Sequence, residues 1–340
     1  MEGQKQLSHA RSPKLARVTE KTEKSFGHRQ TQMATDLRLK SGRQRLREEG
    51  MNPSNPLMRS DMALFARWSI MCIAMVAFLA GCDGGKMVEQ KVQFPDVKSV
   101  SDAQWKKLSQ AKVYFGHQSV GNNILDGIKD VMRESPAIKV NIVETSNPAD
   151  FNRPIFAHSR VGKNVDPKSK TDSFVDFIQQ GIGDKANVAF FKFCYVDMKE
   201  GTNVSDIFDD YKKKMSSLKG RYPNVKFIHV TVPLTTTKIS WKTWIKEKMG
   251  KKDLWEYAGN IERNRFNDLV RKEYEGKEPV FDLAKIESTY PDGTRSSFTS
   301  QGRGYYSLVS EYTKDGGHLN ERGRKLVAEQ LLIFLATLLS

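Results

Sequence analysis

One serine and one aspartate–histidine pair stand out in the sequence, because side chains of these types can act together as a nucleophile, a base and a group that orients the base. In "KVYFGHQSVGNNI", residues 112–124, an apolar run predicts a short strand, Gly116 breaks it, and a helical pattern begins at about Val120. Ser119 therefore stands at a strand-to-helix turn, where a hydroxyl is exposed and the helix N-terminus favours developing negative charge. An acyl-transfer nucleophile beside an oxyanion site needs such a setting. The position equally suits an N-cap serine, so Ser119 alone leaves both interpretations open.

The pair lies in "TKDGGHLNERGRKLVAEQLL", residues 313–332, just before the last helical pattern. Asp315 and His318 are three residues apart in a polar loop that contains two glycines. This spacing lets the carboxylate turn back and hold the Nδ1–H of the imidazole, which leaves Nε2 to take a proton from a hydroxyl. The pair favours the interpretation of Ser119 as a nucleophile.

Short apolar runs alternate with amphipathic patterns through the rest of the chain. The expected strands are Val113–Phe115, Val140–Val143, Val188–Phe193, Lys226–Val232 and Val280–Leu283, and the expected helices are 120–133, 171–181, 204–219, 255–275 and 320–338. This alternation predicts a three-layer α/β/α domain with a mainly parallel, five-stranded sheet. Ligands bind outside the carboxyl ends of such strands. The segments expected there are Gly116–Gly121, His158–Asn164, Cys194–Asp197 and Pro233–Thr237.

The blocks "FGHQSVG" and "DGGHLNERGRKLVAEQL" resemble those of the SGNH/GDSL hydrolase family, which places its serine after the first strand and its Asp-x-x-His before the last helix. "NRFNDLVRKEYEGKEPVFDLAKIES", followed by "YPDG", resembles the penultimate helix and strand of that family. The resemblance covers about residues 110–338. It implies a flavodoxin-like fold with Ser119 as nucleophile, His318 as general base and then acid, and Asp315 orienting His318. It implies no cofactor and no metal.

The chain departs from the family's pattern around the oxyanion site. The usual Gly-Asp-Ser is Gly116-His117-Gln118-Ser119, so the serine lies one place further from the glycine. In the second block the resemblance implies Gly162 as an oxyanion-hole glycine. The third block lacks its asparagine and reads Cys194-Tyr195-Val196-Asp197. The side chains that could replace this donor are those of Asn164, Asn122 and Gln118. His117 either orients the serine or binds substrate, or is a simple turn residue.

Further side chains are weaker candidates. His158, near Arg160, either contacts an acidic substrate or lies in an exposed loop. Cys194 ends an apolar run and is expected to be an inert buried thiol. His229 alternates within a strand and is expected to be a satisfied core residue. Asp197 is expected to stabilise its turn as a hydrogen-bond acceptor.

The N-terminal region predicts export rather than a further domain. Residues 1–61 hold 13 Lys and Arg against 7 Asp and Glu, with few apolar runs, and are expected to be disordered and to stem from an upstream start codon. Residues 62–81 form a positive, then apolar, stretch typical of a signal peptide. Leu79-Ala80-Gly81-Cys82 resembles a lipobox, which implies lipidation of Cys82 and anchoring in a bacterial envelope. Residues 82–103 are expected to be a tether, and residues 104–340 the domain.

Charge and composition limit the kinds of binding partner that are expected. The net charge is +15, but residues 82–340 carry 41 Lys and Arg against 33 Asp and Glu, and the runs "YKKKM", "KEKMGKK" and "ERGRK" are expected to be solvated faces. The three cysteines show no metal-binding spacing, so no structural zinc site is expected. Trp241, Trp244 and Trp255 form either a sugar-stacking wall or lid, or part of the core.

The sequence thus predicts a monomeric, lipid-anchored serine esterase that removes a small acyl group, such as acetyl, from a glycan or similar ester. It is expected to bind the membrane through its N-terminal lipid. It is expected to bind no nucleic acid. An O-acetyltransferase on the same scaffold and a catalytically inactive binding module are the alternatives. The esterase and the transferase share all these residues, so the sequence does not separate them.

Overall fold

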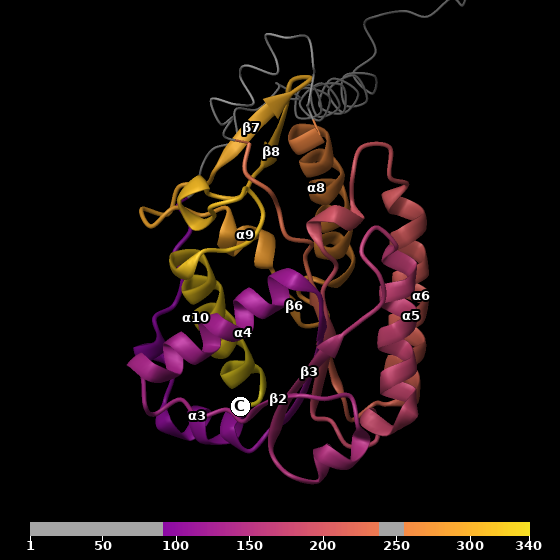
Figure 1. The fold of residues 1–340 in the computed structure, drawn as a ribbon, viewed down its shortest axis with the longest axis vertical. Helices are drawn as coiled ribbons and strands as arrows, with labels where there is room; N and C mark the ends of the chain where they lie inside the picture. Colours follow the sequence, from indigo (N-terminus) through magenta and orange to yellow (C-terminus); the bar gives the residue numbers. More distant parts are fainter. Residues whose placement is uncertain (1–90, 238–254) are drawn as a thin grey trace, which may run out of the picture. The chain divides into compact units, whose positions relative to one another are not determined.

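A central sheet of six parallel strands organises the part of the chain that the computed structural model describes, residues 91–237 and 255–340 (Figure 1). The strands are β1 (Lys112–His117), β2 (Ile142–Glu144), β3 (Ile155–Arg160), β4 (Val188–Phe191), β5 (Lys226–Val230) and β6 (Val280–Phe281). Their order in the sheet is β2-β3-β1-β4-β5-β6, and every pairing is parallel. A separate antiparallel hairpin consists of β7 (Ser297–Ser300) and β8 (Arg303–Tyr306).

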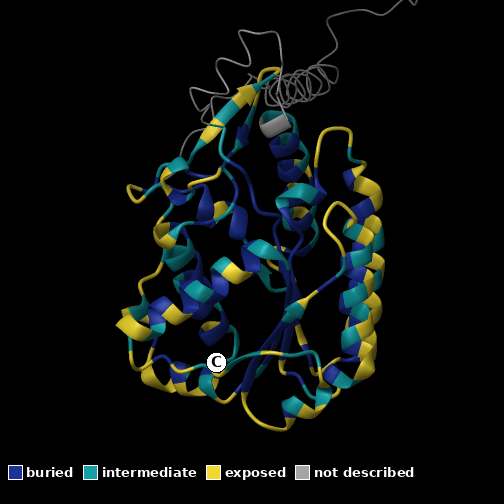
Figure 2. Cartoon of the chain, viewed as in Figure 1, coloured by how far each residue is buried: buried dark blue, intermediate teal, exposed yellow. Residues whose placement is uncertain are grey.

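Helices cover both faces of the sheet (Figure 1). One layer holds α3 (Asp102–Ser109), α4 (Ser119–Glu134), α9 (Leu283–Glu287) and α10 (Glu321–Leu338). The other holds α5 (Pro167–Phe177), α6 (Val204–Arg221) and α8 (Trp255–Tyr274). Alternate strand residues enter opposite cores: Val113 and Phe115 pack on the α4 side and Tyr114 on the α5 side. Figure 2 shows the resulting buried sheet, and the predicted three-layer α/β/α fold is confirmed.

The prediction of five strands is wrong by one. It missed β3, which lies between the edge strand β2 and β1. Only Ile155-Phe156-Ala157 is apolar in this strand, Pro154 precedes it, and His158 follows it, so the sequence shows no long buried run. Tertiary context overrides this weak pattern, because pairing on both edges buries the backbone of β3. The loop that follows β3 is thereby placed beside the end of β1.

The helix predictions agree with the structure to within a few residues, except at α5. This helix begins at Pro167, four residues before the expected start, because Asp166 caps it and accepts from the Ser169 N–H. Its end runs into one π-helical turn, Ile178–Ile182, which contains Gly181 at φ 119°. The early start matters for the site, because the first two turns of α5 then lie against the loop that follows β3.

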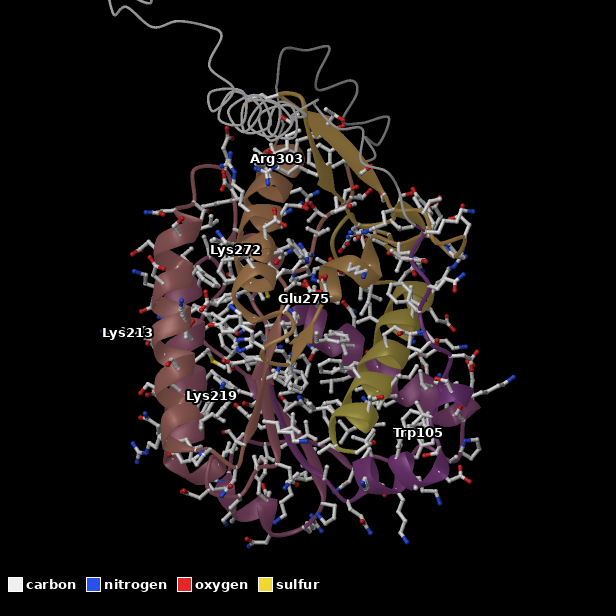
Figure 3. The ribbon with its side chains drawn as sticks, turned by 180° about the vertical axis from the view of Figure 1, so that it is seen from behind. Trp105, Lys213, Lys219, Lys272, Glu275 and Arg303 are labelled. Atoms are coloured by element: carbon white, nitrogen blue, oxygen red, sulfur yellow. The ribbon has the colours of Figure 1, made fainter. Side chains whose placement is uncertain are left out.

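The described part of the expected tether packs on the domain. The Val92 N–H donates to the Gly293 carbonyl at 2.8 Å, and the Gln330 side chain donates to the Pro95 carbonyl at 2.9 Å. Phe94 packs against the main core cluster, which supplies the apolar contact that holds this segment. Helix α3 follows, and its Trp105 is buried (Figure 3). Residues 1–61, the expected signal at 62–81 and Cys82 lie outside the described residues.

Charged side chains cover the outer surfaces of α6 and α8. Figure 3 labels Lys213 and Lys219 on α6, Lys272 on α8 and Glu275 in the turn that follows α8. Several of these charges are paired: Lys219 contacts Glu278 at 2.8 Å, and Lys212 contacts Glu273 at 2.7 Å. The "YKKKM" run is therefore part of a solvated, partly ion-paired face. Within residues 91–237 and 255–340, no helix has the length and apolar character to cross a membrane.

Helices α4 and α10 lie against each other, and this contact positions the two ends of the candidate site. Gly127 of α4 allows the close approach, since an added Cβ would lie 2.3 Å from the Arg324 carbonyl oxygen. The buried Asp130 carboxylate accepts from Arg324 at 2.7 Å, which fixes the register of the two helices. Because Ser119 begins α4 and His318 lies just before α10, this packing brings the two side chains together.

Candidate active site

The structure joins Ser119, His318 and Asp315 in one chain of hydrogen bonds. The distance from Ser119 Oγ to His318 Nε2 is 2.9 Å, and the distance from His318 Nδ1 to Asp315 Oδ2 is 2.7 Å. With Nδ1 protonated and donating to the carboxylate, Nε2 is the acceptor that faces the serine hydroxyl. The three residues thus have the geometry of a hydroxyl nucleophile, its base and the group that orients the base.

Ser119 is not the N-cap of its helix. Helix α4 begins at Ser119 itself, and the capping position is Gln118, which makes no side-chain capping bond. The Ser119 hydroxyl instead contacts His318. Of the two interpretations that the sequence left open, capping is the one that the structure does not support.

Asp315 is held in place by its own loop. Its Oδ1 accepts from the backbone N–H of Gly317 at 3.0 Å and of His318 at 2.8 Å, while Oδ2 accepts from the imidazole. Burial alone would raise the pKa of Asp315, but these hydrogen bonds outweigh burial and lower the pKa to about 2. The carboxylate is therefore ionised at neutral pH and can stabilise a protonated His318.

Two residues that the sequence did not single out for this purpose also hold the histidine loop. The Tyr195 hydroxyl lies 3.5 Å from His318 Nδ1, and its ring meets the imidazole edge-on with centroids 5.7 Å apart. Gly317 leaves room for this ring, because an added Cβ would lie 2.7 Å from it. Asn123 of α4 accepts from the Leu319 N–H at 3.3 Å. No spacing in the sequence links these residues to His318, so only the tertiary structure identifies them.

The side chains of His117 and Gln118 make hydrogen bonds within the fold. His117 is buried, and its Nε2 pairs with His158 Nδ1 at 3.0 Å. Burial lowers the pKa of His117 to about 3, so its ring is neutral. The Gln118 amide donates to the carbonyls of Val161 and Gly162, each at 2.9 Å, and so uses its N–H groups to tie loops together. These two side chains thus brace the turn that leads to Ser119.

Gly162 and Asn164 lie in the loop after β3, which Gln118 ties to the serine turn. Gly162 has φ 52°, and an added Cβ would lie 2.5 Å from the Lys170 backbone nitrogen, so only glycine fits. Asn164 is exposed, and its Oδ1 accepts from Lys170 Nζ at 2.9 Å. Asn122, the other asparagine considered, lies exposed on the first turn of α4. Of the side-chain donors considered, Gln118 uses its N–H groups within the fold, whereas Asn164 is oriented through its oxygen and keeps its N–H groups without a partner among the described residues.

The remaining candidates occupy structural positions. His158 is a buried member of β3 and pairs with His117, so the suggested contact with an acidic substrate is not supported. Cys194 is free and buried. His229 is buried, bonds Tyr211 at 2.7 Å and stacks on Tyr274. Asp197 does accept within its turn, from the Cys194 N–H at 2.7 Å.

Two expectations about ligands lie partly outside what the structure describes. The wall or lid of tryptophans cannot be placed, since Trp241, Trp244 and the Trp255 side chain fall outside the described residues. Among residues 91–237 and 255–340, no group of three or more His, Cys, Asp and Glu side chains is arranged to hold a metal ion.

A buried carboxyl group, Glu287, lies behind the loop that follows β5. Its Oε1 accepts from the Leu234 N–H, and its Oε2 has no hydrogen-bond partner among the described residues. Burial raises the pKa of Glu287 to about 8, with partial opposition from the Leu234 N–H and from the charges of Lys192 and Arg263. The folded protein therefore keeps a proton on Glu287 at neutral pH that the unfolded chain releases.

Glu287→Gln is expected to remove a pH dependence of stability. The folded-state pKa of Glu287 lies above the unfolded value. The stability that the protonated side chain contributes is therefore complete below about pH 4.5 and is lost as the pH rises through about 8. The loss amounts to a few kcal/mol, at about 1.4 kcal/mol per pKa unit. Urea unfolding at several pH values should show E287Q gaining on wild type between about pH 5 and 8. Glu275→Gln, at an exposed position in the turn that follows α8, is the matched control, and equal slopes for wild type and E287Q would contradict the prediction.

No family model matches the chain, and no curated protein matches it. Several solved structures resemble it. A lipase/acylhydrolase from Enterococcus faecalis is 12% identical, with a TM-score of 0.38, and the match covers 67% of this chain and 96% of that one. A G-D-S-L family lipolytic protein from Veillonella parvula is 12% identical, with a TM-score of 0.35 and coverages of 65% and 95%. The periplasmic domain of a Salmonella Paratyphi A lipopolysaccharide acetyltransferase is 13% identical, with a TM-score of 0.37 and coverages of 75% and 97%.

Of these three proteins, the one from Veillonella parvula is described as a member of the G-D-S-L family. At this identity and TM-score the likeness says nothing about substrate or residue roles. The functional conclusion therefore depends on the geometry around Ser119.

Proposed function

We propose that this protein is a serine esterase in which Ser119, His318 and Asp315 form a catalytic triad. The observation that carries the proposal is the continuous hydrogen-bond chain from the Ser119 hydroxyl through both imidazole nitrogens to the Asp315 carboxylate. Such a chain is required to activate a hydroxyl that is otherwise a weak nucleophile at neutral pH. The alternative of a catalytically inactive binding module gives no reason for this alignment.

In the proposed reaction, Ser119 Oγ attacks the carbonyl carbon of the ester while His318 Nε2 takes the hydroxyl proton. The tetrahedral intermediate collapses, the C–O bond to the alcohol breaks, and the alcohol leaves with the proton from His318. Water then attacks the acyl-serine with His318 again acting as base, which releases the carboxylic acid and restores Ser119. Asp315 stays ionised throughout and stabilises the imidazolium.

The negative oxygen of the intermediate needs donors that face it. The backbone N–H of Ser119 lies at the N-terminus of α4, where N–H groups have no partner within the helix and the helix dipole favours negative charge. We assign the second and third donors to the Gly162 N–H and to the Asn164 amide, because the loop that carries both is tied to the serine turn by Gln118. Asn164 thereby takes the place of the asparagine that the third block lacks.

For the substrate, we propose a small acyl ester carried on a large molecule such as a glycan. The side chains of His318 and Asp315 are 38% and 57% exposed, so the reacting centre is open to solvent, as a bulky carrier needs. We further propose, on the lipobox-like Leu79-Ala80-Gly81-Cys82, that a lipid on Cys82 anchors the protein in a bacterial envelope. An exported enzyme would meet acylated glycans there.

A fluorophosphonate probe tests the proposal directly on the whole chain. Intact mass and peptide mapping should show one adduct at Ser119, absent in His318→Ala, and p-nitrophenyl acetate should be hydrolysed. If the folded wild-type protein gave neither labelling nor hydrolysis, a binding module would replace the esterase. Adding an acceptor glycan separates the remaining alternative, since acyl transfer to the glycan in place of release to water would identify an acetyltransferase.

A further inference from the structure

A lysine side chain is buried beside the loop that carries Asn164. Lys170, in the first turns of α5, is 0% exposed, which lysine tolerates only when its charge is paired. Its ammonium contacts Asp197 Oδ2 at 2.5 Å, and the Asp197 side chain is equally buried. The ammonium also donates to Asn164 Oδ1 at 2.9 Å. One buried cation thus joins a carboxylate to the amide of the proposed oxyanion donor.

The Asp197 carboxylate extends this connection to two loops. Its Oδ2 also accepts from the Cys194 N–H at 2.7 Å, and its Oδ1 accepts from the Val165 N–H at 2.9 Å. The first bond belongs to the turn after β4 and the second to the loop after β3. Strands β3 and β4 are the two neighbours of β1, which leads to Ser119. The Lys170–Asp197 pair therefore fixes the loops on both sides of the nucleophile relative to each other.

The ammonium also determines which way the Asn164 amide points. Lysine only donates hydrogen bonds, so the amide atom that faces it must be the oxygen. The Nδ2 group, with its two N–H donors, is then turned away from Lys170. An oxyanion donor must be held in this way before the substrate arrives, because donors that are already oriented cost no reorganisation during the reaction.

The backbone on either side of Asn164 is held in an unusual conformation. Gly162 and Val165 both have positive φ, 52° and 68°. A β-branched residue such as Val165 adopts this region only at an energetic cost, and such residues persist where their surroundings hold them, often at functional sites. The Val165 N–H is held by Asp197, and the Gly162 carbonyl by Gln118, the residue before Ser119.

We propose that Lys170 is a positioning residue that, through its ion pair with Asp197, orients the Asn164 amide as an oxyanion donor. The inference rests on the proposed esterase function and adds to it the group that makes Asn164 competent. Lys170 itself contacts no substrate. Its effect on catalysis therefore passes through Asn164, and this distinguishes it from a residue that only stabilises the fold.

A double-mutant cycle on ester hydrolysis by the whole chain tests this route. Asn164→Ala is expected to lower kcat by about 10²-fold or more, because one oxyanion donor is lost. Lys170→Met is expected to lower kcat by about 10- to 100-fold with little change in KM, because the donor loses its orientation. The double variant should be no slower than Asn164→Ala, since an undirected donor and an absent donor have the same effect. Independent, multiplying losses would overturn the proposal.

Two further variants keep the test decisive if Lys170→Met folds poorly. A double variant that carries Lys170→Met and Asp197→Asn loses both buried charges together. Thermal unfolding shows whether this double variant is folded at the assay temperature. Asn164→Asp keeps an oxygen for Lys170 and so preserves the loop, but it has no N–H donor. We expect it to be at least as slow as Asn164→Ala while unfolding at a temperature close to that of wild type.

The outcomes separate this inference from the proposed function. If the wild type hydrolyses the ester and both Asn164 variants match it, the assignment of Asn164 and Lys170 is overturned and the esterase stands. If the wild type neither hydrolyses esters nor reacts with the fluorophosphonate probe, both are overturned. An Asn164→Asp variant with wild-type kcat would show that the loop alone is needed, and this too would overturn the role of the amide.

Discussion

Ser119→Ala is expected to lower kcat for ester hydrolysis by at least about 10⁴-fold and to abolish fluorophosphonate labelling. The expectation follows from the 2.9 Å contact between Ser119 Oγ and His318 Nε2, which marks this hydroxyl as the one whose proton the base can take. Without the hydroxyl, no acyl-enzyme can form. Any residual rate would come from water activated by His318 and from the oxyanion donors.

The fold should tolerate this change, so the loss of activity can be read as chemistry. Ser119 is the first helical residue and not the cap, and alanine is favourable in helices. Thermal unfolding of Ser119→Ala should therefore match wild type within a few degrees, or about 1 kcal/mol. Ser109→Ala, at a half-buried position at the end of α3, is the matched control and should retain full activity. A Ser119→Ala protein that kept a tenth of the activity would place the nucleophile elsewhere.

The sequence was sufficient to predict the parts of the molecule that depend on local patterns. Ser119 follows a buried strand and begins a helix, and Asp315 and His318 are close in the chain, so strand, helix and loop signals identify all three. The long amphipathic helices α4, α6 and α10 were predicted within a few residues for the same reason. The contact between Ser119 and the Asp315–His318 pair was implied by the resemblance to the SGNH/GDSL hydrolase family, and it agrees with the rule that parallel sheets carry their sites at the carboxyl edge.

Contacts between distant segments were not predictable from one sequence. Strand β3 has a polar second half and is defined by its pairing with β1 and β2, which no local pattern reveals. Lys170 has the sequence setting of an ordinary surface lysine in "PKSKTDSF", yet it is fully buried because Asp197 lies opposite. Tyr195 was noted only as part of a block that lacks asparagine, whereas its contact with His318 depends on the packing of two loops. These residues surround the triad, so the missing information concerns how the site is held rather than which residues react.

Asp315→Asn is expected to lower kcat by about 10⁴-fold while leaving the loop intact. Asp315 Oδ1 accepts two backbone N–H groups, at 2.8 and 3.0 Å, and the amide oxygen of asparagine will keep these bonds. The amide nitrogen must then take the position of Oδ2, 2.7 Å from His318 Nδ1. An amide N–H there donates to Nδ1, so the imidazole proton moves to Nε2. The ring then presents a donor to Ser119 and cannot take its proton.

This argument predicts an order among the Asp315 variants. Asp315→Ala leaves the imidazole free to adopt either tautomer, whereas Asp315→Asn holds it in the unproductive one, so the asparagine variant should be the slower of the two. Because the hydrogen bonds lower the pKa of Asp315 to about 2, its ionisation cannot shape the wild-type pH profile above about pH 4. The comparison needs kcat for the three proteins from about pH 5 to 9, with thermal unfolding as the check on folding. If Asp315→Asn were as active as wild type, Asp315 would be a loop residue only, and the 2.7 Å contact would have no part in activating the serine.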